Sequence, residues 1–199
     1  MLYKDVRRNT GLWNVPWNIV DFETTMLPAP EPIEIAVIPI RGGEILRSSA
    51  YATLLRPSIP PPWRIPRNVS IPAQMLEDAP PLDEVKAEVR KLLGSGVFVH
   101  QARGEAGGLD ARIASKFFSV NMDRVDCFST IRLCKLCEPS ASYSLEALCE
   151  RYKVFNPVPH RAPSDAFATA WVFLQILEGL HRKGVTTFGK FQDFYWNSA

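Results

Sequence analysis

The 199-residue chain lacks any long hydrophobic run. A membrane-spanning helix needs roughly 20 apolar residues, and no segment approaches that length, so we expect no membrane partner. Residues 1–11 are polar and basic, and no apolar stretch of the kind found in secretory signals follows them. These absences predict a cytoplasmic protein.

The chain also has little net charge, +2 from 23 basic and 21 acidic residues. So small an imbalance does not by itself indicate a nucleic-acid partner, because phosphate binding requires basic residues clustered on one surface. Three arginines, Arg56, Arg64 and Arg67, do lie in one proline-rich stretch. On charge alone, a solvated loop is the better interpretation of that stretch.

Cysteine is scarce, and the 4 cysteines do not form a complete metal-binding pattern. Cys134-x-x-Cys137 could begin a zinc site, but no second C-x-x-C or C-x-x-H pair follows it. The residues around this pair have the apolar spacing of a helix face, where free cysteine packs as a small hydrophobic side chain. We therefore predict core packing for the cysteines, without disulfides.

The remaining composition, 46% hydrophobic and 22% charged, is typical of one globular domain. Strands are predicted, in chain order, at residues 18–22, 33–40, 44–55, 97–99 and 125–128. Helices are predicted at residues 83–93, 110–118, 144–148 and 163–180, with a short helix or tail at 188–196. Three strands followed by alternating strands and helices predict an α/β domain with a mixed sheet and three α/β/α layers.

The first informative motif is Asp21-Phe22-Glu23, at the end of a predicted strand. Residues two apart in a strand point to the same face, so the two carboxylates would lie side by side. Such close like charges repel unless a cation neutralises them, and an all-oxygen ligand set favours Mg²⁺ or Mn²⁺. Taken alone, the pair could equally be a solvated strand end.

The second motif pairs His160, in a predicted loop, with Asp165, in the first turn of a long helix. Asp165 could complete a metal site with the strand carboxylates. Histidine is the side chain best suited to exchange protons near neutral pH, so His160 could act as a general base. Each residue alone would be interpreted more simply, as a helix-capping acid and a solvent-facing loop histidine.

Together the motifs resemble the DEDDh branch of the DnaQ-like 3′→5′ exonucleases. Residues 19–25, IVDFETT, match the strand and D-x-E-T-T of the family's first motif, and residues 160–166, HRAPSDA, match its third motif, H-R-A-x-x-D-A, without a gap. Weaker similarities occur in the expected order at residues 70–80, 97–100 and 143–148. The resemblance extends from about residue 17 to residue 180.

Three departures from the family pattern affect the site. Met26 replaces the glycine that follows E-T-T, and Gln101 replaces the asparagine that follows the second-motif histidine, His100. An ungapped count from His100 puts the family's second-motif aspartate on Glu105. We predict a five-residue insertion that makes Asp110 the fourth carboxylate, because Asp110 begins a packed helix whereas Glu105 lies among glycines.

The resemblance implies a ribonuclease H-like fold with a five-stranded mixed sheet. It divides the chain into an N-terminal extension (1–16), an exonuclease domain (17–180) and a C-terminal tail or short helix packed on that domain (181–199). Its implied substrate is the 3′ end of single-stranded DNA or RNA, and a DNA polymerase is a conceivable protein partner. Its implied cofactors are two divalent cations, Mg²⁺ or Mn²⁺.

The resemblance also assigns roles to individual residues. The implied metal ligands are Asp21, Glu23, Asp110 and Asp165. His160 would be the general base, and nucleoside 5′-monophosphates would be the products. The implied substrate contacts are Thr24, Met26 and His100.

Two other interpretations stay open at this point. Loss of one carboxylate through the irregular second motif would leave a catalytically weakened binding or polymerase accessory module. A ribonuclease H-like endonuclease or transposase-type enzyme would share the fold, but it would not explain the histidine placed five residues ahead of Asp165.

Overall fold

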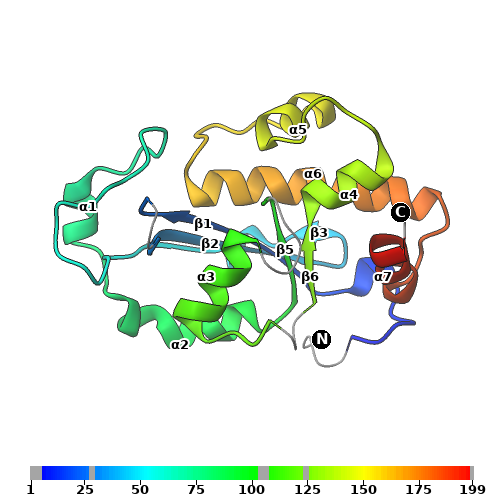
Figure 1. The fold of residues 1–199 in the computed structure, drawn as a ribbon. Coiled ribbons are helices and arrows are strands. Elements are labelled where there is room, and N and C mark those ends of the chain that lie inside the picture. The colour runs from blue at the N-terminus through cyan, green and yellow to red at the C-terminus, as the bar shows by residue number, and fades with distance from the viewer. Residues whose placement is uncertain (1–5, 27–29, 103–107, 123–125, 198–199) are drawn as a thin grey trace.

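The computed structural model describes residues 6–26, 30–102, 108–122 and 126–197. Its centre is one mixed sheet of six strands, five of them in the order β3-β2-β1-β5-β6, with β4 also paired to β2 (Figure 1). The strands are β1 (Trp17–Thr24), β2 (Pro32–Arg41), β3 (Glu44–Ile45), β4 (Tyr51–Leu54), β5 (Val97–His100) and β6 (Cys127–Ser129). β2 runs antiparallel to β1, β3 and β4, whereas β5 runs parallel to β1 and β6. The predicted α/β class and mixed sheet are confirmed.

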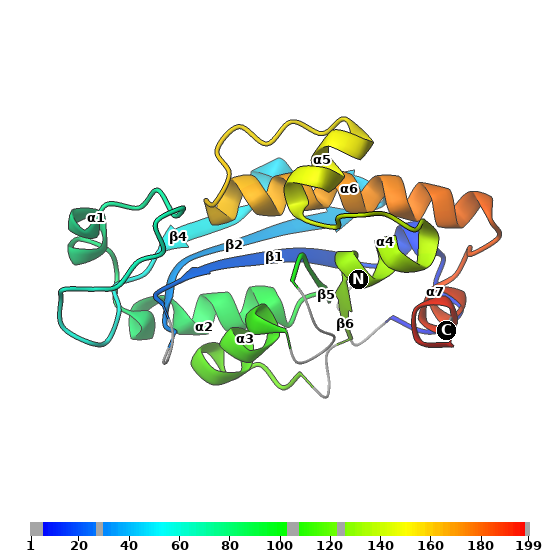
Figure 2. The ribbon, with the colours of Figure 1, turned by 45° about the horizontal axis from the view of Figure 1, so that its top comes forward.

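Helices cover both faces of this sheet (Figure 2). α2 (Leu82–Leu93) and α3 (Leu109–Phe118) pack on one face. α4 (Thr130–Cys137), α5 (Leu145–Tyr152) and α6 (Ala162–Arg182) form the layer on the other face. α6 is rich in buried alanine and lies directly across β1 and β2, because small side chains allow a helix to approach a sheet closely. Its first turn thereby reaches the end of β1.

The structure differs from the sequence prediction in the segment at residues 44–55. This segment is not one strand, because the 3-10 turn η3 (Arg47–Ser49) divides it into β3 and β4. The sheet therefore has six strands where five were expected. A short helix, α1 (Ala73–Glu77), lies in the proline-rich region, where no helix was predicted. The predicted strand at 125–128 is found as β6, although Val125 itself lies outside the described residues.

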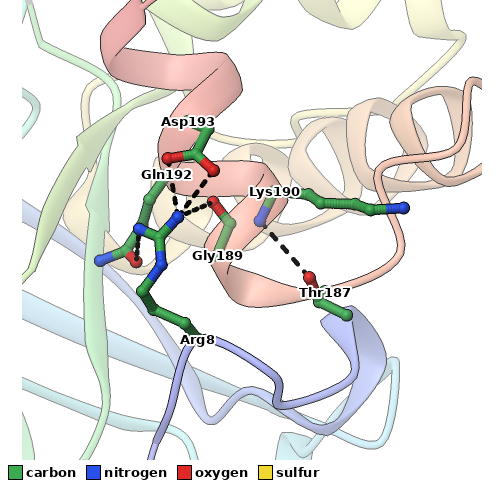
Figure 3. Close-up of polar contacts among 6 residues, drawn as sticks. All are labelled: Arg8, Thr187, Gly189, Lys190, Gln192 and Asp193. Carbon is green, nitrogen blue, oxygen red and sulfur yellow. Dashed lines mark hydrogen bonds and ion pairs between the residues drawn. The ribbon is translucent and has the colours of Figure 1, made fainter.

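The two ends of the described chain pack against each other and against the core. Trp17 is in edge-on contact with Phe188 and Phe191 of α7 (Phe188–Asn197), with ring centroids 5.8 and 5.1 Å apart. Arg8 forms an ion pair with Asp193 at 2.6 Å (Figure 3). The Arg8 carbonyl also accepts a 2.7 Å hydrogen bond from the Gly189 amide. These contacts hold α7 against β1 and the N-terminal segment, and Tyr195 of α7 also packs edge-on against Phe128 of β6.

Three of the four cysteines, Cys127, Cys134 and Cys149, are buried, and all four are free thiols. Burial raises the pKa of Cys134 to about 12, so its thiol stays protonated at neutral pH. These three cysteines pack in the core as predicted, and the partly buried Cys137 packs against it. Among the described residues, no helix is both long and apolar enough to cross a membrane.

Candidate metal-dependent nuclease site

Two acidic residues at the end of β1 face the helical layer that contains α6. Ile19 lies on the same side of β1 as Asp21 and Glu23, and it is buried in the hydrophobic cluster that includes α6. Side chains two residues apart in a strand share a face, so both carboxylates point toward the first turn of α6. Phe22 points the other way, with its ring 5.8 Å from that of Phe118. Phe22 is thus a core residue, 6% exposed.

The start of α6 brings Asp165 and His160 to the same place. The Asp165 carboxylate accepts hydrogen bonds from Asn156 Nδ2 at 2.6 Å and from the His160 backbone amide at 3.2 Å. His160 has a φ of 60°, a left-handed conformation that few non-glycine residues adopt and that is often found at functional sites. Ligand atoms of Glu23, His160 and Asp165 lie within 4.8 Å of one another, a spacing that one metal ion could bridge.

Asp110 reaches the same site from the first turn of α3. It is buried, and its charge contributes to raising the pKa of both Asp21 and Glu23. Asp110 Oδ2 lies 3.3 Å from Nδ1 of His100, which is completely buried at the end of β5. The structure thus brings together all four predicted metal ligands. Glu105, the alternative fourth carboxylate, lies outside the described residues.

The crowding of these acids sets their protonation. Burial raises the pKa of Asp21 well above its usual range, and the charges of Asp110, Asp165 and Glu23 raise it further. Burial, followed by the charges of Asp165, Glu34 and Asp110, raises the pKa of Glu23 to about 7. Burial also raises the pKa of Asp165, against the lowering effect of its hydrogen bond from Asn156.

A cluster of carboxylates with raised pKa values is the arrangement that a hard divalent cation relieves. The donor set is mainly oxygen, with one imidazole nearby, and it includes no cysteine. Mg²⁺ and Mn²⁺ prefer such oxygen ligands, so the residues present fit these ions.

Glu34 on β2 is a site residue that the sequence pattern did not single out. It lies directly opposite Glu23 in the sheet and is only 2% exposed. Its carboxylate accepts hydrogen bonds from Arg161 Nε at 3.1 Å and Nη2 at 2.6 Å, and from the Ala162 amide at 2.8 Å. Glu34 therefore ties Arg161, the N-cap of α6, and Ala162, its first residue, to the sheet. A signal was available, because an acid at an inward position of an otherwise apolar strand needs a partner.

The predicted substrate contacts have different surroundings. Thr24 is buried, whereas Met26 is 49% exposed and its amide donates a 2.7 Å hydrogen bond to the carbonyl of Arg64. The arginine-containing loop thus passes beside the end of β1, and the side chains of Arg64 and Arg67 are exposed there. His100 is buried against Asp110, so its ring is covered by protein and not by solvent.

Comparison with known proteins agrees with this geometry. The family model described as "Exonuclease" (RNase_T) matches residues 19–173, most of the chain. A PolC-type DNA polymerase III of Thermotoga petrophila is 31% identical over 193 residues, which cover 96% of this chain and 14% of that protein. The 3′-5′ exonuclease DinG of Bacillus subtilis is 30% identical, covering 82% of this chain and 18% of its own length. The chain thus spans less than a fifth of these curated relatives.

Solved structures share the fold. Exonuclease X in complex with 5′-overhanging duplex DNA superposes with a TM-score of 0.62 at 24% identity, covering 81% of this chain and 91% of that one. The nuclease domain of 3′hExo, a DEDDh family member bound to rAMP, gives a TM-score of 0.65 at 14% identity, covering 84% and 94% of the two chains. With a family model matched over most of its length, this chain belongs to the exonuclease (RNase_T) family.

Proposed function

We propose that this protein hydrolyses phosphodiester bonds at the 3′ ends of nucleic acids and releases nucleoside 5′-monophosphates with the help of two Mg²⁺ or Mn²⁺ ions. The observation that carries the proposal is the convergence of four carboxylates from β1, α3 and α6 beside an exposed histidine. Two relatives in the same family carry the names of a DNA polymerase and a 3′-5′ exonuclease, which supports this substrate class.

Asp21, Glu23, Asp110 and Asp165 would hold the ions. When bound, the ions would supply Lewis-acid stabilisation of charge on the phosphate and on the departing 3′-oxygen. The carboxylates must lose their protons to bind cations, and their raised pKa values make that release depend on pH. Burial keeps competing water away from Asp110, whose helix fixes its position.

His160 would remove the proton from the attacking water. Its side chain is exposed at the mouth of the site, within 4.8 Å of ligand atoms of Glu23 and Asp165. Its backbone bond to Asp165 and the Glu34–Arg161 pair on its other side would hold the loop in a working position. General-base catalysis depends on such positioning as much as on proton affinity.

Thr24 and the exposed Met26 would contact the terminal sugar and base, and the neighbouring Arg64 and Arg67 could meet backbone phosphates. His100 is proposed to act on substrate only indirectly, through Asp110, because its ring is buried. A single-stranded 3′ end and a polymerase remain the proposed partners, and the cytoplasm the proposed location.

The experiment is digestion of matched DNA and RNA oligonucleotides, single- and double-stranded and labelled at the 3′ end, with Mg²⁺, Mn²⁺ or EDTA. We expect labelled mononucleotide to appear first, only with a divalent ion. Binding of the oligonucleotides without any cleavage would instead favour a catalytically inactive binding module. Internal cleavage products would indicate an endonuclease.

A further inference from the structure

A groove of about 520 Å³ lies along the first half of α6, next to the metal site but separate from it. Its walls include Arg47, Phe155, Val158, Phe167 and Trp171. Arg47 belongs to η3, between β3 and β4, so the groove extends from α6 to this turn. None of the proposed metal ligands lines it.

The groove exposes aromatic surface that the fold does not use. Phe155 is 84% exposed and Trp171 is 42% exposed, although large apolar side chains are normally covered. Contiguous exposed apolar surface of this kind usually marks a binding site. Two aromatic faces accessible in one groove can accept a flat ring by stacking.

The charge of the groove is positive. Its ten lining residues include two arginines, Arg47 and Arg161, and no acid. Arg161 forms an ion pair with Glu34. Arg47 forms no ion pair with any described residue, and its guanidinium lies 5.3 Å from the centre of the Phe167 ring. A cation beside aromatic faces suits an occupant that combines flat rings with negative charge.

The groove and the metal site share one wall. The loop that carries His160 also contributes Phe155, Val158 and Arg161 to the groove. Trp171 follows Asp165 by six residues on α6, which is about 9 Å along the helix axis. A nucleic-acid strand whose 3′ end lies at the metal site could therefore cross the loop that carries His160 and place a base in the groove.

We propose that this groove binds an unpaired nucleobase of the substrate strand, a few nucleotides from its 3′ end, by stacking on Phe155 and Trp171, with Arg47 facing the adjacent phosphate. The inference rests on the proposed function. Because the bases of a duplex are already paired and stacked, the groove selects single-stranded substrate.

The test compares two substrates of different length. The p-nitrophenyl ester of thymidine 5′-monophosphate fits the metal site alone, whereas a long single-stranded oligonucleotide reaches the groove. For Phe155→Ala/Trp171→Ala, we expect the ratio of kcat/KM for the oligonucleotide to kcat/KM for the ester to fall, through KM, by about 5- to 150-fold. That factor corresponds to a loss of about 1–3 kcal/mol of base stacking. Trp196→Ala is the matched control, since Trp196 on α7 is 43% exposed and distant in sequence from the groove.

If the double variant has the same ratio of the two kcat/KM values as the wild-type protein, the groove does not bind the substrate. The proposed nuclease function would then stay intact. A wild-type protein that cleaves neither substrate with Mg²⁺ or Mn²⁺ would overturn the proposed function itself. Light scattering on the same samples tests whether a second copy of this chain occupies the groove instead. If the double variant is monomeric where the wild type is dimeric, the groove is an interface between two copies and the proposal is wrong.

Discussion

The identity of the fourth carboxylate, Asp110 or Glu105, is the least regular part of the predicted site. An ungapped count from His100 selects Glu105, which lies outside the described residues, whereas Asp110 is buried and its charge is one of those that raise the pKa of Asp21. We expect Asp110→Asn to abolish Mg²⁺-dependent cleavage, because one proposed metal ligand is lost. Glu105→Gln should retain most of the activity. Nuclease assays of the two variants side by side make the check. Loss of activity in Glu105→Gln, with Asp110→Asn near wild type, would contradict the predicted insertion and make Glu105 the fourth carboxylate.

His160 is expected to move a proton and not to hold the metal. His160→Ala should keep its affinity for Mn²⁺ but turn over about 10²–10⁴ times more slowly. At saturating metal, the wild-type protein and the variant should therefore differ in kcat and not in metal occupancy. Calorimetric titration with Mn²⁺ is the control. Since His160 lies within 4.8 Å of two ligands, a collapse of affinity in the variant would make it a ligand instead.

The sequence singled out Asp21, Glu23, His160 and Asp165 because each lies in a short motif with fixed spacing. Asp110 was singled out only through a predicted insertion and its position at the start of a helix. Glu34 was missed because its function depends on a contact with Arg161, which is 127 positions away in the sequence. The burial of His100 was missed for a similar reason. Only the packing of α3 against β5 decides whether that ring meets substrate or Asp110.

At the scale of elements, the Glu34–Arg161 pair joins β2 to α6. Glu34→Gln leaves a neutral acceptor beside the guanidinium, so the first turn of α6 should loosen. We expect a loss of about 1.5–3 kcal/mol in the free energy of unfolding, the range for a hydrogen bond to a charged group, together with lower kcat. Urea unfolding and nuclease assays measure both effects.

Glu178→Gln is the matched control for that change. Glu178 pairs with Arg182 at 3.1 Å on the same helix, but both side chains are more than half exposed. Such pairs contribute little, so stability should change by less than about 1 kcal/mol and activity should be unaffected. Equal effects of the two substitutions would show that the buried pair has no special positioning role.

Elements with a clear hydrophobic period were predicted well, since β1, α2, α3 and α6 begin and end within a few residues of their expected positions. The division of residues 44–55 was not predictable, because η3 has no proline or glycine to mark it and depends on its contact with β2. α1 was missed because the prolines around it favour loops, and its buried Leu76 packs on Ile33, Val69 and Ile71 only in the folded chain.

At the scale of the whole molecule, the carboxylate cluster predicts a pH-dependent stability. The pKa of Glu23 is raised from 4.5 to about 7 in the folded protein, so between these pH values the folded state keeps a proton that the unfolded chain has released. Stability without metal should therefore fall as pH rises through this window, by on the order of 3 kcal/mol from Glu23. The slope should be smaller in Glu23→Gln.

Urea unfolding in EDTA at several pH values between 4.5 and about 7 measures this slope. Adding Mg²⁺ or Mn²⁺ should restore the stability lost at the upper end, because the ions bind the ionised carboxylates of the folded state. A wild-type slope identical to that of Glu23→Gln would contradict the predicted crowding of charge.

The most direct measurement is release of the 3′-terminal mononucleotide by Asp21→Ala beside the wild-type protein, at saturating Mg²⁺ or Mn²⁺. The charges of all the other proposed ligands raise the pKa of Asp21, which indicates that it lies among them. Loss of its carboxylate should therefore abolish release. Relief of carboxylate repulsion should leave the metal-free protein as stable as before, or slightly more so. The account predicts a folded, inactive variant next to an active wild type. A purified Asp21→Ala protein that still releases mononucleotides at the wild-type rate would contradict it.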